Sequence, residues 1–243
     1  MEAVSVDPPG GALSNVIDRQ RVIDRFTGVA PSQWGTHLPG VATHVDGGAL
    51  ALTFDGCGGG SGSGVDHALL DLLAREQIPA TFFLNRRWID THPALTTQLS
   101  ESPLFTIENH GTTHAPLSVN GRSAYGIAGT ASVAAAVDEV LGNHYRIEEL
   151  TGRTPQWFRA GTAHYDDVAV QVVAELGLGV AGFAVNGDAG ATFHANQVRN
   201  ALVQAQPGSI VLMHLNHPGS GVAEGVAAAV PALRASGTHF TTL

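Results

Sequence analysis

The sequence predicts a single α/β domain folded as a (β/α) barrel, and three observations support this fold class. Short apolar runs alternate with helical patterns of about 10 to 20 residues roughly seven times, as in a parallel sheet covered by helices. The length of 243 residues suits one such domain. Polar side chains follow several of the apolar runs, and in these barrels the carboxyl ends of the strands open on one face. The barrel can be closed or incomplete.

Residues 1–47 are expected to form an N-terminal arm and lead-in that packs on a barrel of residues 48–243. The arm begins with a stretch rich in Gly and Pro. A short helical lead-in is predicted at residues 16–26. Residues 30–46 then form a loop that lies over the barrel, with Trp34 as its anchor.

The first barrel strand is predicted at residues 50–54, a run typical of a buried parallel strand, and it ends at Asp55 before a glycine-rich loop. Residues 66–75 form a helix, because leucines recur at helical spacing behind Asp66, a suitable N-cap. The later strands are predicted at 80–84, 105–108, 157–159, 180–185, 209–214 and 239–243, and the later helices at 93–100, 131–150, 167–176, 196–205 and 222–235.

Composition excludes several classes of protein. The net charge is −9, and the 12 basic residues are all arginines scattered along the chain, so we expect no nucleic-acid partner. The single cysteine, Cys57, excludes an internal disulfide. No run approaches the roughly 18 apolar residues of a membrane span, and the first residues do not read as a signal peptide.

Candidate catalytic residues stand where predicted strands end, so they are expected to converge on one mouth of the barrel. They are Asp55, His110 with His114, Arg159, Asp188 and His214.

The pair His110 and His114 is the clearest candidate for metal binding. Two imidazoles four residues apart at a strand end can point at one divalent cation, and imidazole suits zinc, cobalt or nickel. The plain alternative is a pair of loop histidines that hydrogen-bond to the backbone, because such spacings also arise by accident.

The ordered motifs LTFD with its glycine-rich turn, NHGTTH, FR, GDAG and IVLMH resemble those of the polysaccharide deacetylases, carbohydrate esterase family four. The resemblance covers about residues 48–243. It implies a distorted (β/α)7-type barrel of the NodB-homology kind. It also implies hydrolysis of the acetamide of N-acetylated sugars, chitin or peptidoglycan among them, with one bound metal.

The resemblance also implies a role for each matching residue. Asp55 would be the general base that deprotonates a metal-bound water, and His214 would be the general acid that protonates the leaving amine. Arg159 would orient the base, and Asp188 would hold His214 in its working tautomer and favour its charged form.

The third motif lacks the prolines that follow the arginine in the family, here Arg159, and the first motif departs from the family pattern at one position. A second aspartate, the third protein ligand of the metal, is replaced here by Gly56. The missing ligand can be Asp55 itself, the thiolate of Cys57, or Asp66 reaching back across the loop. Two plain interpretations count against Cys57 and Asp66 as metal ligands. A lone cysteine is often an inert small hydrophobic residue, and Asp66 is well placed to cap a helix. Family variants with Cys-Gly-Gly after a small residue look similar to this chain, so we interpret Gly56 as a subfamily feature.

The leading hypothesis is therefore a metal-dependent enzyme, with zinc as the first candidate metal, that removes N-acetyl groups from an acetylated oligo- or polysaccharide. One alternative is an amidase for a small non-sugar amide with a weak metal or none, which the missing carboxylate at Gly56 favours. The other is a non-catalytic glycan-binding relative. The resemblance points to work outside the cytoplasm, on cell wall or extracellular glycan.

Overall fold

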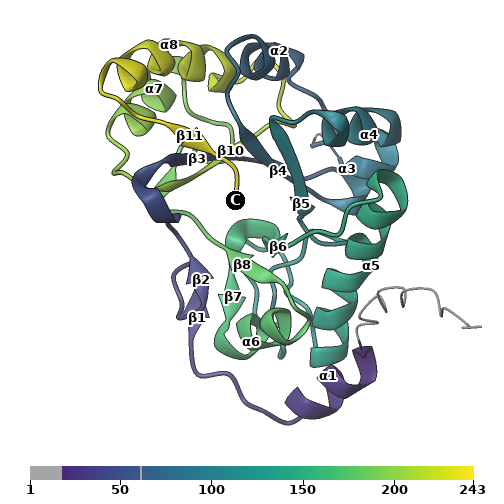
Figure 1. The fold of residues 1–243 in the computed structure, drawn as a ribbon. Coiled ribbons are helices and arrows are strands. Elements are labelled where there is room, and N and C mark those ends of the chain that lie inside the picture. Colours follow the sequence, from purple (N-terminus) through teal and green to yellow (C-terminus); the bar gives the residue numbers. More distant parts are fainter. Residues whose placement is uncertain (1–17, 61) are drawn as a thin grey trace, which may run out of the picture.

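A computed structural model describes residues 18–60 and 62–243, so the expected Gly- and Pro-rich start of the arm lies outside the described residues. Its main sheet has nine strands, all paired in parallel, in the order β2-β8-β6-β5-β4-β3-β10-β9 with β11 also against β3. The sheet curls into a partial barrel with the helices around its outside (Figure 1). The predicted fold class is confirmed.

The strands of this sheet are short except at its centre. They are β2 (Val41–Ala42), β3 (Leu50–Gly56), β4 (Ala80–Leu84), β5 (Phe105–Asn109), β6 (Trp157–Phe158), β8 (Gly179–Ala181), β9 (Val185–Asn186), β10 (Ile210–His214) and β11 (Phe240–Thr241). A second, two-stranded sheet pairs β1 (Trp34–Gly35) with β7 (Tyr165–Asp166) in antiparallel fashion.

The α-helices of the described ranges lie between strands in the sequence, except the first, which precedes them all. They are α1 (Arg19–Phe26), α2 (His67–Arg75), α3 (Arg86–Thr91), α4 (Pro93–Glu101), α5 (Val133–Thr151), α6 (Asp167–Glu175), α7 (Ala195–Val203) and α8 (Val222–Ala235). None of those in the described ranges combines the length and the apolar character that crossing a membrane requires.

Sequence signals explain why the central elements form where they do. All seven residues of β3 are buried, as expected for a parallel strand covered on both faces. Asp66 caps α2 by accepting a hydrogen bond from the Leu69 amide at 3.0 Å. Gly152 ends α5 in the left-handed conformation, with φ of 65°.

The structure differs from the prediction at several places, among them the unpredicted strands β1 and β7. The predicted strand at 180–185 is divided into β8 and β9, because the carbonyl of Gly182 between them accepts a hydrogen bond from Arg159 instead of continuing the ladder. Helix α3 follows β4 directly and was not predicted. Strand β2 lies in the stretch that the sequence assigns to the arm, and it pairs with β8.

Candidate active site

The predicted catalytic residues come together at the carboxyl ends of the strands. Asp55 lies beside His214 in the register of β3 with β10, and His110 directly follows β5. A pocket of about 440 Å³ is lined by Asp55, His110, His114 and His214. Arg159 and Asp188 lie fully buried behind these side chains.

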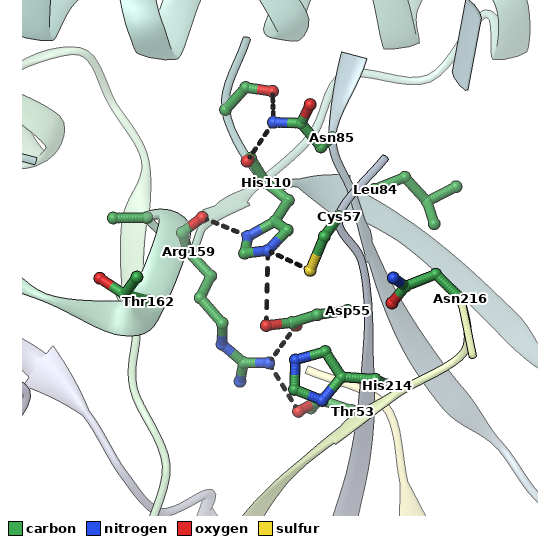
Figure 2. A network of polar contacts seen from close by, with 12 residues as sticks. Thr53, Asp55, Cys57, Leu84, Asn85, His110, Arg159, Thr162, His214 and Asn216 are labelled. Atoms are coloured by element: carbon green, nitrogen blue, oxygen red, sulfur yellow. Dashed lines mark hydrogen bonds and ion pairs between the residues drawn. The ribbon is translucent and has the colours of Figure 1, made fainter. Parts of the chain in front are cut away.

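Asp55 and Arg159 form the buried centre of the site. Nη1 of Arg159 donates to Oδ1 of Asp55 at 2.8 Å, and the guanidinium also donates to the Thr53 hydroxyl at 2.9 Å (Figure 2). The Phe83 ring lies 4.2 Å from the guanidinium carbon. Burial by itself raises the pKa of the Asp55 carboxyl, but Arg159, His110 and His214 outweigh it and hold this pKa below its ordinary value.

His110 is oriented by a backbone carbonyl. Its Nδ1 lies 2.8 Å from the carbonyl oxygen of Arg159, which can only accept, so Nδ1 carries the proton. The other nitrogen, Nε2, therefore faces the site, 3.5 Å from Oδ2 of Asp55 and 3.8 Å from Sγ of Cys57. The His114 ring stands edge-on to that of His110, with 4.8 Å between the ring centroids. This is the arrangement of a metal-ligating histidine with an outer hydrogen-bond partner.

Cys57 belongs to this histidine group. One ligand atom each from Cys57, His110 and His114 lie within 4.8 Å of one another. Burial raises the pKa of the Cys57 thiol, but hydrogen bonds with His110, His114 and His214 lower it well below its ordinary value overall. Asp66, the other proposed substitute ligand, is placed at the start of α2 and is not a member of the group.

The His214–Asp188 pair lies on the other side of Asp55. Nδ1 of His214 is 3.0 and 3.1 Å from the two carboxylate oxygens of Asp188, and the His214 amide donates to the same carboxylate at 2.7 Å. Burial lowers the pKa of the imidazole, but the hydrogen bonds with Asp188 and Cys57 raise it well above its ordinary value overall. His214 can therefore hold a proton at neutral pH.

Two buried polar residues that the sequence analysis did not single out fix the histidine loop. Both carboxylate oxygens of Glu139 accept from the Thr113 amide, and one also accepts from the Ala115 amide at 3.2 Å. Nδ2 of Asn85 donates to the carbonyls of His110 and Gly111. Glu139 was recognisable in principle, because an acid on the apolar stripe of a predicted helix calls for a partner.

The remaining pocket wall holds residues that sequence reasoning left unassigned or missed. Thr162 has a positive φ of 65°, and its buried hydroxyl has no hydrogen-bond partner among the described residues. Tyr125 lines the pocket although its side chain is 83% exposed. Both Tyr125 and Gly126 have positive φ in a tight hairpin turn, a conformation that favours Asn or Gly over Tyr.

Comparison with known proteins gives one family and a consistent fold. The sequence model of the polysaccharide deacetylase family matches residues 43–181, more than half of the chain. A comparison with curated protein sequences found no significant match.

Several solved structures have a similar fold at low sequence identity. They include a CE4 family pseudoenzyme from Bacillus anthracis (TM-score 0.68, 21% identity, covering 82% of this chain and 65% of that one). A family 4 carbohydrate esterase from Bacillus subtilis has a TM-score of 0.66 and 19% identity, covering 92% of this chain and 86% of its own. Another from Streptomyces lividans, in complex with acetate, has a TM-score of 0.65 and 22% identity, covering 82% and 93%. The chain thus spans about two thirds of the length of the pseudoenzyme.

Proposed function

The chain belongs to the polysaccharide deacetylase family, and we propose that it hydrolyses the N-acetyl groups of an N-acetylated glycan of the chitooligosaccharide or peptidoglycan type. The observation that carries the proposal is that a buried carboxylate, Asp55, and a carboxylate-paired imidazole, His214, line one pocket together with His110 and His114. Such glycans lie largely outside the cytoplasm, and we place the activity there.

Amide hydrolysis needs a base for the attacking water and an acid for the leaving nitrogen. Asp55 is suited to the first task, because the depression of its pKa keeps it ionised and able to accept a proton. His214 is suited to the second, because its raised pKa keeps it protonated at neutral pH. Asp188 accepts from Nδ1 of His214, which leaves Nε2 as the nitrogen that delivers the proton.

The histidine group fits a divalent metal of the zinc, cobalt or nickel kind. His110 and His114 would hold it, since Nδ1 of His110 is engaged with the Arg159 carbonyl and Nε2 is free to bind. When bound, such a metal lowers the pKa of a coordinated water toward neutrality and polarises the acetamide carbonyl.

Thr162 is the best candidate to bind the carbonyl oxygen of the substrate. The Ala163 amide already donates to the Ala160 carbonyl at 2.9 Å, and Gly161 does not line the pocket. Thr162 does line it, with a buried hydroxyl that lacks a partner. Its positive φ holds the residue in a strained conformation, as is common at functional sites.

The shape of the pocket favours a glycan over a small amide. Its volume of about 440 Å³ exceeds what a small amide fills, and the exposed Tyr125 ring at its wall offers a flat face suited to a sugar ring. An amidase for a small amide, with a weak metal or none, remains the alternative that weak metal binding would favour. The second alternative is a non-catalytic glycan-binding role, since one protein of similar fold is a pseudoenzyme.

Acetate release from chitooligosaccharides and from peptidoglycan fragments tests the proposal. We expect wild-type protein with added metal to release acetate, and the variants Asp55→Asn and His214→Ala each to lose about 100- to 10,000-fold in rate. Asp71→Asn and His239→Ala, which change exposed residues away from the pocket, serve as controls. Wild-type rates in both active-site variants would remove the proposed function. Activity on small amides alone, unaffected by chelation, would establish the amidase instead.

A further inference from the structure

We infer that Cys57 is the third protein ligand of this site, so that a zinc-type cation is held by one thiolate and two imidazoles, those of His110 and His114. The inference rests on the proposed function only in assuming that the site takes a metal. The inferred set of metal ligands, one thiolate and two imidazoles, differs from a set of two histidines and one carboxylate. The Sγ of Cys57 lies 3.8 Å from Nε2 of His110, and the ligand atoms of all three residues lie within 4.8 Å of one another.

The direction of residue 56 supports this assignment. A Cβ atom built at Gly56 would lie 2.8 Å from Cδ2 of Leu84 and 3.4 Å from side-chain atoms of Leu215 and Trp88. A side chain at this position would therefore enter an apolar wall, away from the histidines. Successive residues of a strand point to opposite faces, so Asp55, the residue before Gly56 in β3, points to the face that Gly56 avoids, where its Oδ2 lies 3.5 Å from Nε2 of His110. Figure 2 shows the Cys57 sulfur turned toward the His110 ring.

The turn after Cys57 is built to hold its backbone in place. A Cβ atom at Gly58 would lie 2.5 Å from the backbone nitrogen of Trp88, so only glycine lets the chain pack this closely on α3. The Gly58 amide donates to the Gly62 carbonyl at 2.9 Å, and Nη2 of Arg87 donates to the Cys57 carbonyl at 3.3 Å. The glycine-rich loop thus fixes the position from which the thiol reaches the histidines.

The surroundings of Cys57 do not suit an inert apolar cysteine. Its sulfur contacts Nε2 of His110, whose other nitrogen is already used by the Arg159 carbonyl. When Nε2 carries no proton, the ring presents a lone pair toward the sulfur. Two electron-pair donors facing each other are unfavourable unless a proton or a cation lies between them. A thiolate and imidazoles are preferred ligands of zinc, and three protein ligands leave the open position of a catalytic site.

X-ray absorption of the zinc-loaded wild-type protein tests the inference without relying on activity. We expect one sulfur neighbour at about 2.3 Å together with nitrogen or oxygen neighbours at about 2.0–2.1 Å. The Cys57→Ser variant should lose the sulfur neighbour. Its zinc affinity should fall by more than the roughly 10- to 100-fold that loss of an outer partner produces. Zinc bound to the wild-type protein without sulfur, or no zinc bound at all, would overturn the inference.

Thiol alkylation gives a second measurement on the unaltered chain. Cys57 is the only cysteine, so the alkylation rate reports this residue alone. Zinc should slow alkylation strongly, whereas an equal rate with and without zinc contradicts ligation by the thiolate.

Acetate release separates failure of this inference from failure of the proposed function. Deacetylation by a protein whose zinc has no sulfur neighbour would leave the function standing and remove Cys57 as ligand. A zinc ion with a sulfur neighbour in a protein that deacetylates no glycan would support Cys57 as a ligand and remove the proposed function.

Discussion

Nη1 of Arg159 donates to Oδ1 of Asp55 at 2.8 Å inside the barrel, where Arg159 is 0% and Asp55 is 3% exposed. Arg159 directly follows β6, so the pair links the end of β6 to β3 across the site. Removing one partner of a buried ion pair leaves the other charge buried without compensation, which costs stability. Each residue of this pair therefore depends on the other. The same contact helps to hold the pKa of the Asp55 carboxyl, the proposed base, below its ordinary value. This one ion pair thus contributes both to the stability of the fold and to the ionised state of the proposed base.

Replacing Arg159 with Met should lower the free energy of unfolding at neutral pH by about 3–5 kcal/mol, because Asp55 is left buried without its cation. A depressed carboxyl pKa stabilises the fold above the ordinary carboxyl range, and this contribution is lost as the pH falls through the folded-state pKa. The difference between wild type and variant should therefore be largest near neutral pH and shrink on acidification. Urea unfolding over a pH series measures it. Arg153→Met, at an exposed arginine, is the control, and equal losses in the two variants would contradict the role of the pair.

The Asp188→Asn variant should shift the alkaline limb of the kcat/KM profile to lower pH. Asn can still accept from His214, so the geometry is largely kept while the negative charge that raises the imidazole pKa is lost. If His214 is the general acid, as proposed, the rate falls at the pH where it deprotonates, and the variant moves that pH down toward the ordinary histidine pKa of about 6.5. Rates of acetate release across pH measure the shift, with Asp71→Asn as control. A profile identical to wild type would show that Asp188 only positions the ring.

Much of the fold follows from the sequence because its central strands and helices are long enough to carry a pattern. The run that forms β3 and the leucines of α2 are examples. The pairing of β1 with β7 has no such signal, since two-residue strands show no periodicity and Trp34 meets Asp166 only through the tertiary fold. Helix α3 is too short for a helical pattern, and its start depends on the Asn85 cap.

Motif order let us name the candidate site residues, and the structure brings Asp55, His110, His114 and His214 to one pocket. The motifs could not give the direction in which residue 56 points, because that direction depends on where Leu84 packs in the fold. Tyr125 was not predicted for a similar reason. An exposed tyrosine in a loop is ordinary in sequence, and only the fold places it at the pocket.

Tyr125→Ala should raise KM for chitooligosaccharides about 2- to 10-fold, the equivalent of about 0.5–1.5 kcal/mol of aromatic contact. We expect kcat to change little, because the ring binds substrate and transition state alike. Tyr125→Phe should behave like wild type, and Tyr145→Ala, at an exposed tyrosine of α5 outside the pocket, is the matched control. Initial rates over a series of chain lengths provide the measurement. An unchanged KM for every length would exclude Tyr125 from substrate binding.

Glu139→Gln should weaken zinc binding about 10- to 100-fold, as expected when a residue that orients the metal ligands is altered. Both Glu139 oxygens accept hydrogen bonds from the loop between His110 and Ala115. Glutamine offers one acceptor oxygen and turns an NH₂ group toward an amide N–H of this loop. The loop, in which His114 has a positive φ of 66°, should then lose its fixed conformation.

Competition with a chromophoric chelator measures the zinc affinity of Glu139→Gln, and thermal unfolding of the metal-free protein is recorded beside it. Glu149→Gln, at an exposed acid on the same helix, is the control. A purely structural role predicts a lower melting temperature with wild-type zinc affinity in the folded protein. A positioning role predicts weaker zinc binding, and a rate that recovers when zinc is added to saturation, since Glu139 is not among the residues that line the pocket.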